Sequence, residues 1–184
     1  ISWTRALRRD VENGTTHKFN FNEFITTLYR PFCKQNLYYD KPFIESPGLS
    51  SSLFPNDGYH NLVISVTGSG ASKPFSILIS NSVPNLDNVE KAQCFPLYYY
   101  EKNDTTQKGL FDTGSKEEYI CRDAISDFIF TRAKKQYGKN VTKEDIFYYV
   151  YGFLHSKEYR EKFANDLKKM LPRLPLVDDV RDFW

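Results

Sequence analysis

The residues IFYYVYGFLHSKEYREKF at positions 146–163, followed by MLPRLP at positions 170–175, decide how the C-terminal part of this chain folds. Just before them, Thr142 and Asp145 have the spacing of a capping box and predict the start of a helix, although Asp replaces the preferred Glu or Gln. Apolar residues then recur at helical spacing along one face: Ile146, Tyr149, Val150, Phe153 and Leu154. The stretch has no evident catalytic group, so we expect it to determine architecture and partners.

Two more helices are predicted around this one. Ser156 can cap a helix whose apolar stripe is Tyr159, Phe163, Leu167 and Met170 and which must end before Pro172. Upstream, a helix is expected with one face formed by Ile120, Ala124, Phe128 and Ile129, and with Gly138 at its end. The C-terminal part is therefore predicted to contain three helices.

The N-terminal half carries strand signals instead. Residues 61–67 and 74–80 are β-branched, apolar runs separated by the glycine-containing segment 68–73, which predicts a hairpin. Residues 93–100 predict another strand, in which Pro96 indicates an edge position or a bulge. Residues 37–39 predict a short strand as well.

The first residues suggest a different local order. Ser2 is expected to cap a short helix that runs toward Val11 and ends at Gly14. The aromatic-rich segment that follows closes on Arg30, which is biased toward extended geometry because a proline comes next.

The polar stretch 101–116 is the best internal boundary, because the apolar period changes there from two to about 3.6 residues. We expect a strand-rich part over residues 1–100, a connecting loop over 101–116 and a helical part over 117–184, in one compact unit. Strands followed by helices are typical of an α+β fold. The chain starts at Ile1 and stops at Trp184 within an aromatic segment, so we expect it to be a piece of a longer polypeptide.

Composition and charge exclude several classes of protein. With 184 residues and 40% hydrophobic content the chain can bury a core. A net charge of +2 is too low for a small autonomous nucleic-acid binder, unless the basic groups share one face or another domain supplies phosphate contacts. The three cysteines are far apart and no C-x-x-C pair occurs, so free thiols in a reducing cytoplasm are expected rather than disulfides or zinc. No apolar run reaches the roughly 20 residues of a membrane span.

The sequence contains no complete motif for catalysis or nucleotide binding. The segment 67–73 resembles a phosphate-binding loop, but no glycine precedes Lys73, Pro74 follows it, and the next segment reads as a strand. None of the three histidines has metal-ligand spacing to another histidine or to a cysteine. We therefore expect no catalytic residue, no cofactor-binding residue and no metal ligand in this chain.

Contacts to DNA are better supported by the residue types. Arg30, Gln35 and Asn36 can bind base edges in a bidentate manner, and Lys34 lies beside them. The alternative for Arg30 is that it pairs with a carboxylate and orders the loop. Hydroxyl, amide and lysine donors at a hairpin tip suit a phosphate backbone. The further candidates are Ser69, Ser72 and Lys73 at that tip and Lys102, Gln107 and Lys108 in the boundary loop.

Taken together, four segments resemble one known family. YRPFCKQ at 29–35 with LYY at 37–39, NLVISVTGSGASKPFS at 61–76, QCFPLY at 93–98 and DIFYYVYG at 145–152 are similar to the C-terminal specificity region of type ISP single-chain restriction-modification enzymes. Similar helical residues also occur in type IIG restriction enzymes, so the combination is more specific than the helices alone.

The resemblance implies a parent enzyme with a nuclease, a helicase-like ATPase and an adenine-N6 methyltransferase upstream, which would use ATP, Mg²⁺ and S-adenosylmethionine. No motif of these activities occurs here. The implied role of this chain is sequence-specific recognition of double-stranded DNA beside the methyltransferase domain, in the bacterial cytoplasm and without a membrane. The alternative is a module that docks and stiffens neighbouring domains without reading bases.

Overall fold

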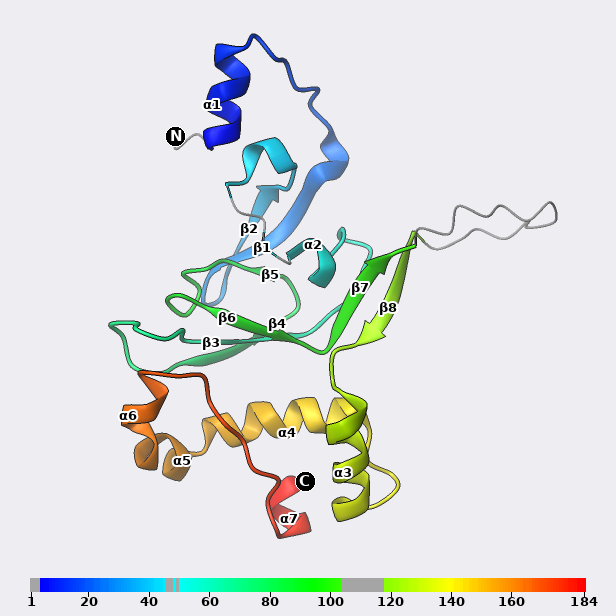
Figure 1. Ribbon diagram of the computed structural model, residues 1–184, viewed down its shortest axis with the longest axis vertical. Coiled ribbons are helices and arrows are strands. Elements are labelled where there is room, and N and C mark those ends of the chain that lie inside the picture. The colour runs from blue at the N-terminus through cyan, green and yellow to red at the C-terminus, as the bar shows by residue number, and fades with distance from the viewer. Residues whose placement is uncertain (1–3, 46–47, 49, 104–117) are drawn as a thin grey trace, which may run out of the picture.

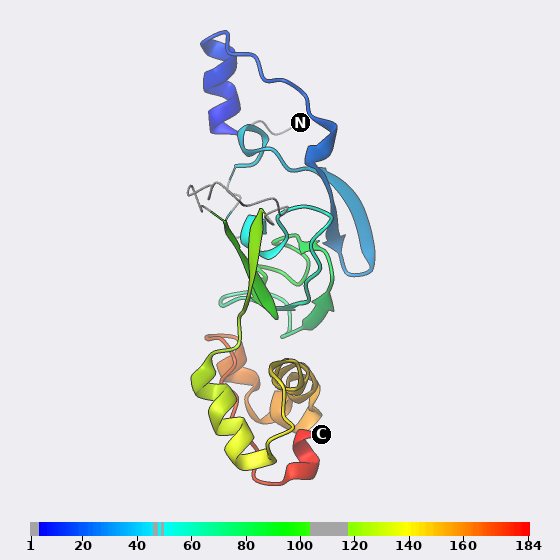
Figure 2. The ribbon, with the colours of Figure 1, turned by 90° about the vertical axis from the view of Figure 1, so that its right-hand side faces the viewer.

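The computed structural model describes residues 4–45, 48, 50–103 and 118–184. The molecule is elongated, with three tiers along its long axis (Figure 1 and, turned by 90°, Figure 2). An N-terminal helix and a β-hairpin form the first tier, a three-stranded sheet forms the second, and helices form the third. The α+β order expected from the sequence is confirmed.

The first tier is built on β1 (Phe24–Arg30), which pairs antiparallel with β2 (Cys33–Tyr38) and parallel with the short β5 (Val83–Pro84). Its helical elements are α1 (Arg5–Glu12) and the 3-10 helices Phe21–Glu23 and Lys41–Phe43. The extended geometry predicted for Arg30 is confirmed.

The helix α1 begins later than predicted. Its cap is Thr4 rather than Ser2, because the Thr4 hydroxyl accepts a hydrogen bond from the Leu7 amide at 3.0 Å. Thr4 also donates to the Pro42 carbonyl at 2.8 Å, which ties the helix start to the 3-10 helix Lys41–Phe43. Gly14 follows the helix with a positive φ of 68°, as its predicted role requires.

The second tier is a sheet of order β4-β3-β6, formed by β3 (Val63–Val66), β4 (Ile77–Ser80) and β6 (Gln93–Pro96). The β3–β4 hairpin and the edge position of Pro96 are both confirmed. The strand predicted at 93–100 breaks at Leu97, and β7 (Tyr98–Lys102) leaves the sheet to pair with β8 (Tyr119–Asp123). A short helix, α2 (Ser50–Leu53), precedes the sheet in the chain.

The strand β3 is buried on both faces and joins the tiers. Ile64 and Val66 belong to the cluster that α4 covers, and Val63 belongs to the cluster formed with β1 and Phe54. Successive side chains of a strand point to opposite faces, so one four-residue strand contributes to two cores. This explains why its sequence is apolar at nearly every position.

The third tier contains α3 (Asp127–Tyr137), α4 (Lys143–His155), α5 (Lys157–Lys162), α6 (Ala164–Leu167) and α7 (Val180–Phe183). The capping box at Thr142, the Ser156 cap and the terminal Gly138 are confirmed. None of the helices in the described ranges combines the length and the apolar character needed to cross a bilayer.

Two details of the predicted helices are wrong. Ile120 lies in β8, opposite Glu101 of β7, and α3 starts only at Asp127 after its Ser126 cap, so the proposed helical face does not exist. Strand pairing in the folded state overrides the local helical spacing there. The third helix breaks at Phe163 into α5 and α6, although its Tyr159 and Leu167 are buried as predicted.

Tyrosine hydroxyl groups hold the segment that leaves the last helices. Tyr159, Tyr149 and Tyr137 donate to the carbonyl oxygens of residues 173, 175 and 177, at 3.1, 2.7 and 2.7 Å. The donors come from α5, α4 and α3 in that order, and each acceptor carbonyl lies two residues further along the chain than the one before it. The extended segment after Pro172 is thus fixed across the helical tier.

The hydroxyl of Tyr149 should make the stability of this chain sensitive to alkaline pH. Burial raises its pKa from 10.0 to about 12. A raised phenol pKa means that the stabilisation is complete below pH 10 and is lost as the pH rises toward about 12. Tyr149→Phe should lower the free energy of unfolding by about 1 kcal/mol at neutral pH and flatten the alkaline loss, measured by urea unfolding.

Tyr148→Phe is the matched control, because Tyr148 is 46% exposed and makes no hydrogen bond with the described residues. Identical alkaline slopes for the wild type and Tyr149→Phe would show that the hydroxyl does not hold the segment.

Candidate nucleic-acid interface

The β1–β2 hairpin has a two-residue turn at its tip. Arg30 pairs with Cys33 across the ladder, so Pro31 and Phe32 make the turn. Proline fixes its own φ at the value that the first turn position needs. Phe32 then has a φ of 64°, the left-handed region that favours glycine, and its side chain is 91% exposed.

Arg30 is held by the loop below the tip. Its guanidinium donates to the Asp87 carbonyl at 2.9 Å, lies 4.0 Å from the Asp87 carboxylate and stands 4.7 Å from the centre of the Tyr29 ring. The pairing with a carboxylate, left open as an alternative, is therefore present. Both side chains remain half-exposed, so the guanidinium is still accessible to solvent.

The other candidates of this hairpin lie on β2. Lys34 donates to the Asn81 side-chain oxygen at 3.0 Å. Gln35 and Asn36 lie opposite Thr27 and Thr26 and are exposed, because β2 is the edge strand of its sheet. Their side-chain amide groups have no hydrogen-bond partner among the described residues.

The β3–β4 loop is arranged around a carboxylate that the sequence did not single out. Glu90 accepts hydrogen bonds from the Ser72 amide at 3.0 Å, the Ser72 hydroxyl at 2.9 Å and the Lys73 amide at 2.8 Å. These bonds, led by that of the Ser72 amide, lower the pKa of Glu90 below its ordinary value. The two amides are thus already used, whereas Ser69 and the Lys73 ammonium remain exposed.

Close approach of two backbones completes this loop. Gly68 donates to the Glu90 carbonyl, and a Cβ at position 68 would collide with the Lys91 carbonyl oxygen. The Lys91 ammonium donates to the Gly70 carbonyl at 2.7 Å, and the Gly70 amide donates to the Lys168 carbonyl. The loop is therefore fixed to the helical tier as well.

Residues 81–91, here called the bridging segment, join the tips of both hairpins. Asn81 and Asp87 bind Lys34 and Arg30 of the first hairpin, and Glu90 and Lys91 bind the loop of the second. The structure thus brings together two of the predicted groups, which are 30 or more positions apart in the chain. Both tips lie on the left-hand side in Figure 1.

The remaining candidates do not join this site. Lys102 is the last residue of β7, and the β7–β8 ribbon lies on the right-hand side in Figure 1. Gln107 and Lys108 lie outside the described residues.

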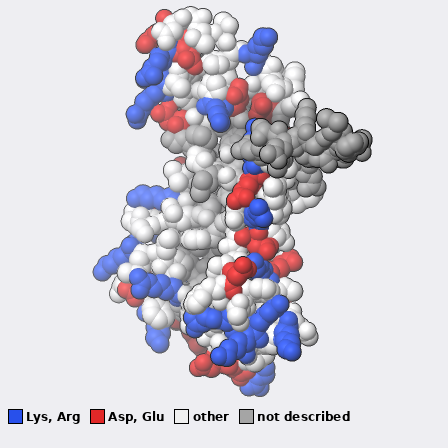
Figure 3. All heavy atoms as spheres, turned by 45° about the vertical axis from the view of Figure 1, so that its right-hand side comes forward, with Lys and Arg blue, Asp and Glu red and all other residues white. Residues whose placement is uncertain are grey.

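Charged side chains are distributed unevenly over the surface. In Figure 3 basic and acidic side chains alternate over much of the visible face, while basic ones prevail along the left-hand edge at the level of the sheet and helices. The joined tips contribute Arg30, Lys34, Lys73 and Lys91, against the acids Asp87 and Glu90. A chain of low net charge can therefore still present a locally basic edge.

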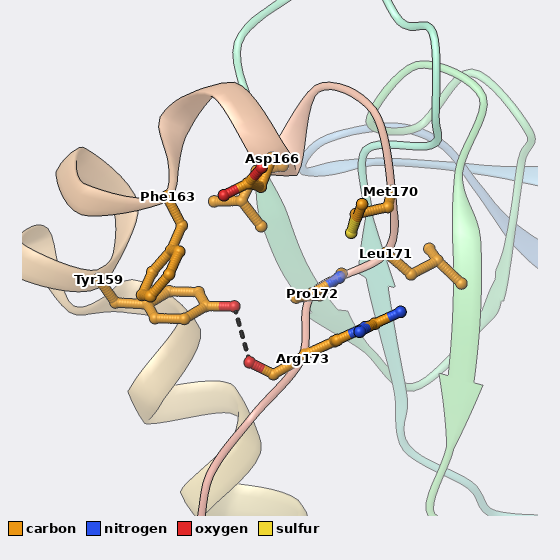
Figure 4. Close-up of a pocket in the computed structure, with 8 residues that line it drawn as sticks. Tyr159, Phe163, Asp166, Met170, Leu171, Pro172 and Arg173 are labelled. Atoms are coloured by element: carbon orange, nitrogen blue, oxygen red, sulfur yellow. Dashed lines mark hydrogen bonds between the residues drawn. The ribbon is translucent and has the colours of Figure 1, made fainter.

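A hollow in the helical tier is lined mainly by apolar side chains. The hollow between α5, α6 and the exit segment has a volume of about 230 Å³. Tyr159 and Phe163 form one side, Met170 and Leu171 lie across from them, and the only hydrogen bond drawn joins Tyr159 to the Arg173 carbonyl (Figure 4). No cluster of metal-binding side chains occurs among the described residues. All three cysteines are free, as expected.

Comparison with known proteins gives one family. The description "Type ISP C-terminal specificity domain" matches residues 1–184. The whole chain also superposes on part of three solved structures. A DrdV–DNA complex has 32% identity, a TM-score of 0.84 and 17% of its chain covered. The type ISP enzyme LlaBIII bound to DNA has 30% identity, a TM-score of 0.82 and 11% of its chain covered. A nuclease-deletion mutant of the type ISP enzyme LlaGI in complex with a DNA substrate mimic has 29% identity, a TM-score of 0.75 and 12% of its chain covered.

The present chain therefore spans less than a fifth of the length of each of these three structures. No curated protein matches it.

Glu90 should determine the order of the β3–β4 loop. Glu90→Gln removes the charge and one acceptor oxygen, so we expect faster hydrogen exchange at the Ser72 and Lys73 amides and unchanged exchange in β3. The loop amides favour the ionised carboxylate, which is why the pKa of Glu90 lies below its ordinary value of 4.5. In the wild type we therefore expect the same loosening as the pH falls through this lowered pKa and Glu90 becomes protonated.

The control is Glu161→Gln, which removes an exposed carboxylate that faces Lys157 within α5. If both variants leave exchange at Ser72 and Lys73 unchanged, the carboxylate is not what orders the loop.

Proposed function

This chain belongs to the type ISP C-terminal specificity domains, and from that membership we propose that it recognises its target sequence in double-stranded DNA through the joined tips of the β1–β2 and β3–β4 hairpins. The single observation that carries this site is the bridging segment, which fixes both tips on one edge of the molecule. Two-stranded ribbons of this kind fit the major groove of B-DNA.

The contacts within the chain suggest a division of roles. Arg30 and Lys34 are positioned by Asp87 and Asn81, which suits cations that hold a phosphate backbone at a fixed place. Gln35 and Asn36 are exposed and have no partner among the described residues. Free side-chain amides are able to read adenine in the major groove. Gln35 and Asn36 point to opposite faces of β2, so we propose that one of the two is the base reader. Ser69 and Lys73 are proposed phosphate contacts.

The proposal treats this domain as a binding module within an enzyme. The family belongs to restriction-modification enzymes, and nuclease, ATPase and adenine methyltransferase activities are assigned to other parts of the parent chain. The ATP, Mg²⁺ and S-adenosylmethionine of those activities would bind there. The modest charge of +2 fits a domain that closes on DNA opposite the methyltransferase domain, in the bacterial cytoplasm where its substrate lies.

A second role, docking to a neighbouring domain, is favoured by a separate surface. Phe19, Phe21, Phe24, Tyr38 and Phe43 form an aromatic cluster on the first tier, with ring centres 4.8–6.4 Å apart in the contacting pairs. Phe21 is 79% exposed. Exposed contiguous aromatic surface is typical of an interface. We assign it to contact with the methyltransferase domain of the same chain.

Substitutions in β2 should separate base reading from backbone binding in the full-length enzyme. Gln35→Ala or Asn36→Ala should reduce discrimination at one base pair by about 1–3 kcal/mol, because a bidentate contact is lost. Lys34→Ala should weaken binding to all sequences alike and reduce the slope of log K against log salt by about 0.9, the value for one phosphate contact. Fluorescence titration over a set of single-base target variants measures both.

Lys135→Ala is the matched control, because Lys135 lies in α3, away from both tips. If Gln35→Ala, Asn36→Ala and Lys34→Ala all retain wild-type affinity, specificity and salt slope, the joined tips do not bind DNA.

The aromatic cluster can be tested independently of DNA. Phe21→Ser should leave the melting temperature of the isolated 184-residue chain unchanged, because the ring is exposed there. In the full-length enzyme it should speed proteolytic release of this domain, since the exposed ring would lose its contact. Phe128→Ser, at a ring that is 72% exposed on α3, serves as control. Equal cleavage rates for both variants and the wild type would contradict docking through this cluster.

A further inference from the structure

Phe32 combines two features that the fold itself does not need. Its ring is 91% exposed and so contributes almost no apolar burial to folding. Its backbone has a φ of 64°, which is an outlier for a bulky residue and ordinary for glycine. A strained, solvent-exposed aromatic residue at a turn tip lowers stability, and strain of this kind concentrates at functional sites.

The tip that carries this ring is held in place on both sides. The pairing of β1 with β2 shifts register between Leu28 and Arg30 and resumes at the Arg30–Cys33 pair, directly beside the turn. Arg30, two residues before the ring, is hydrogen-bonded to Asp87, and Lys34, two residues after it, is hydrogen-bonded to Asn81. A ring on such a base is presented in a fixed direction at little further loss of conformational entropy on binding.

A nearby groove does not account for the ring. Phe32 lies at the margin of a hollow lined also by Leu28, Leu78 and Ile79. The ring does not fill it, since nearly all of its surface remains accessible. Among the described residues, the apolar side chains that line this hollow with Phe32 therefore cover only a small part of its ring.

We infer that Phe32 is a wedge that inserts its ring against the bases of one partly opened base-pair step in the bound DNA, while Arg30 and Lys34 lie near the phosphates on either side. Apolar side chains of minor-groove proteins open base steps in this manner, and we assign the same action to a ring at the tip of a ribbon in the major groove, where the unstacked base regains contact on the ring. This inference rests on the proposed function and adds a contact that reads the deformability of a step rather than its hydrogen-bonding groups.

The test uses the full-length enzyme and duplexes that carry the target site. Phe32→Gly removes the ring and suits the positive φ, so the variant should melt at a higher temperature than the wild type. On the intact duplex it should bind about tenfold or more weakly, as expected when stacking worth about 1–3 kcal/mol is lost, with an unchanged salt slope. Phe32→Trp should retain tight binding, and Phe128→Ala should behave as wild type.

A scan with single abasic nucleotides locates the step. Opening a step that lacks one base costs less, so the wild type should bind one abasic duplex more tightly than its neighbours, at a position other than the methylated adenine. Phe32→Gly should lose that preference. A scan in which thymine is replaced by uracil distinguishes a simple contact of the ring with a thymine methyl group, which would overturn the wedge.

The results distinguish failure of the Phe32 wedge from failure of the proposed DNA-binding site. If Lys34→Ala weakens binding but Phe32→Gly binds like wild type, the hairpin contacts DNA and the wedge is wrong. If neither variant changes affinity, salt slope or specificity, the proposed site itself is wrong.

Discussion

Burial of β3 on both faces is the constraint on which the rest of the structure depends. Ile64 and Val66 face the helical tier, where Phe147 and Leu154 of α4 meet them, and Val63 faces the β1 side. A strand with two cores cannot shift by one residue without moving every side chain to the wrong face. The register of β4 and β6 against β3 is thereby fixed, and so is the place at which each loop leaves the sheet.

The site follows from that constraint through the loops. Because β4 and β6 flank β3, the bridging segment between them must cross from one edge of the sheet to the other, where it meets both hairpin tips. It contains residues that match what the tips offer: Asp87 for Arg30, Asn81 for Lys34 and Glu90 for the amides of Ser72 and Lys73. Loops bonded in this way are rigid enough to carry specificity, which depends on geometry more than on total charge.

Local signals in the sequence were sufficient where the interaction is local. The capping box at Thr142, the Ser156 cap and the extended Arg30 before proline each depend on neighbours within four positions, and each was predicted. Ile120 was assigned to a helix because its strand partner, Glu101, is far away in the chain. Glu90 was not singled out for the same reason: a carboxylate that binds amides 17 and 18 positions away, on a backbone with positive φ, leaves no periodic pattern in the sequence.

What the fold leaves unused is as informative as what it binds. Tyrosine hydroxyls satisfy carbonyls of the exit segment, and Glu90 satisfies the amides of Ser72 and Lys73. Against that background the free amides of Gln35 and Asn36 and the exposed ring of Phe32 stand together on one rigid ribbon. A folded chain gains nothing from strain at Phe32. On the proposed function, bound DNA would take up the ring, which stands on a ribbon that Asp87 and Asn81 hold from both sides.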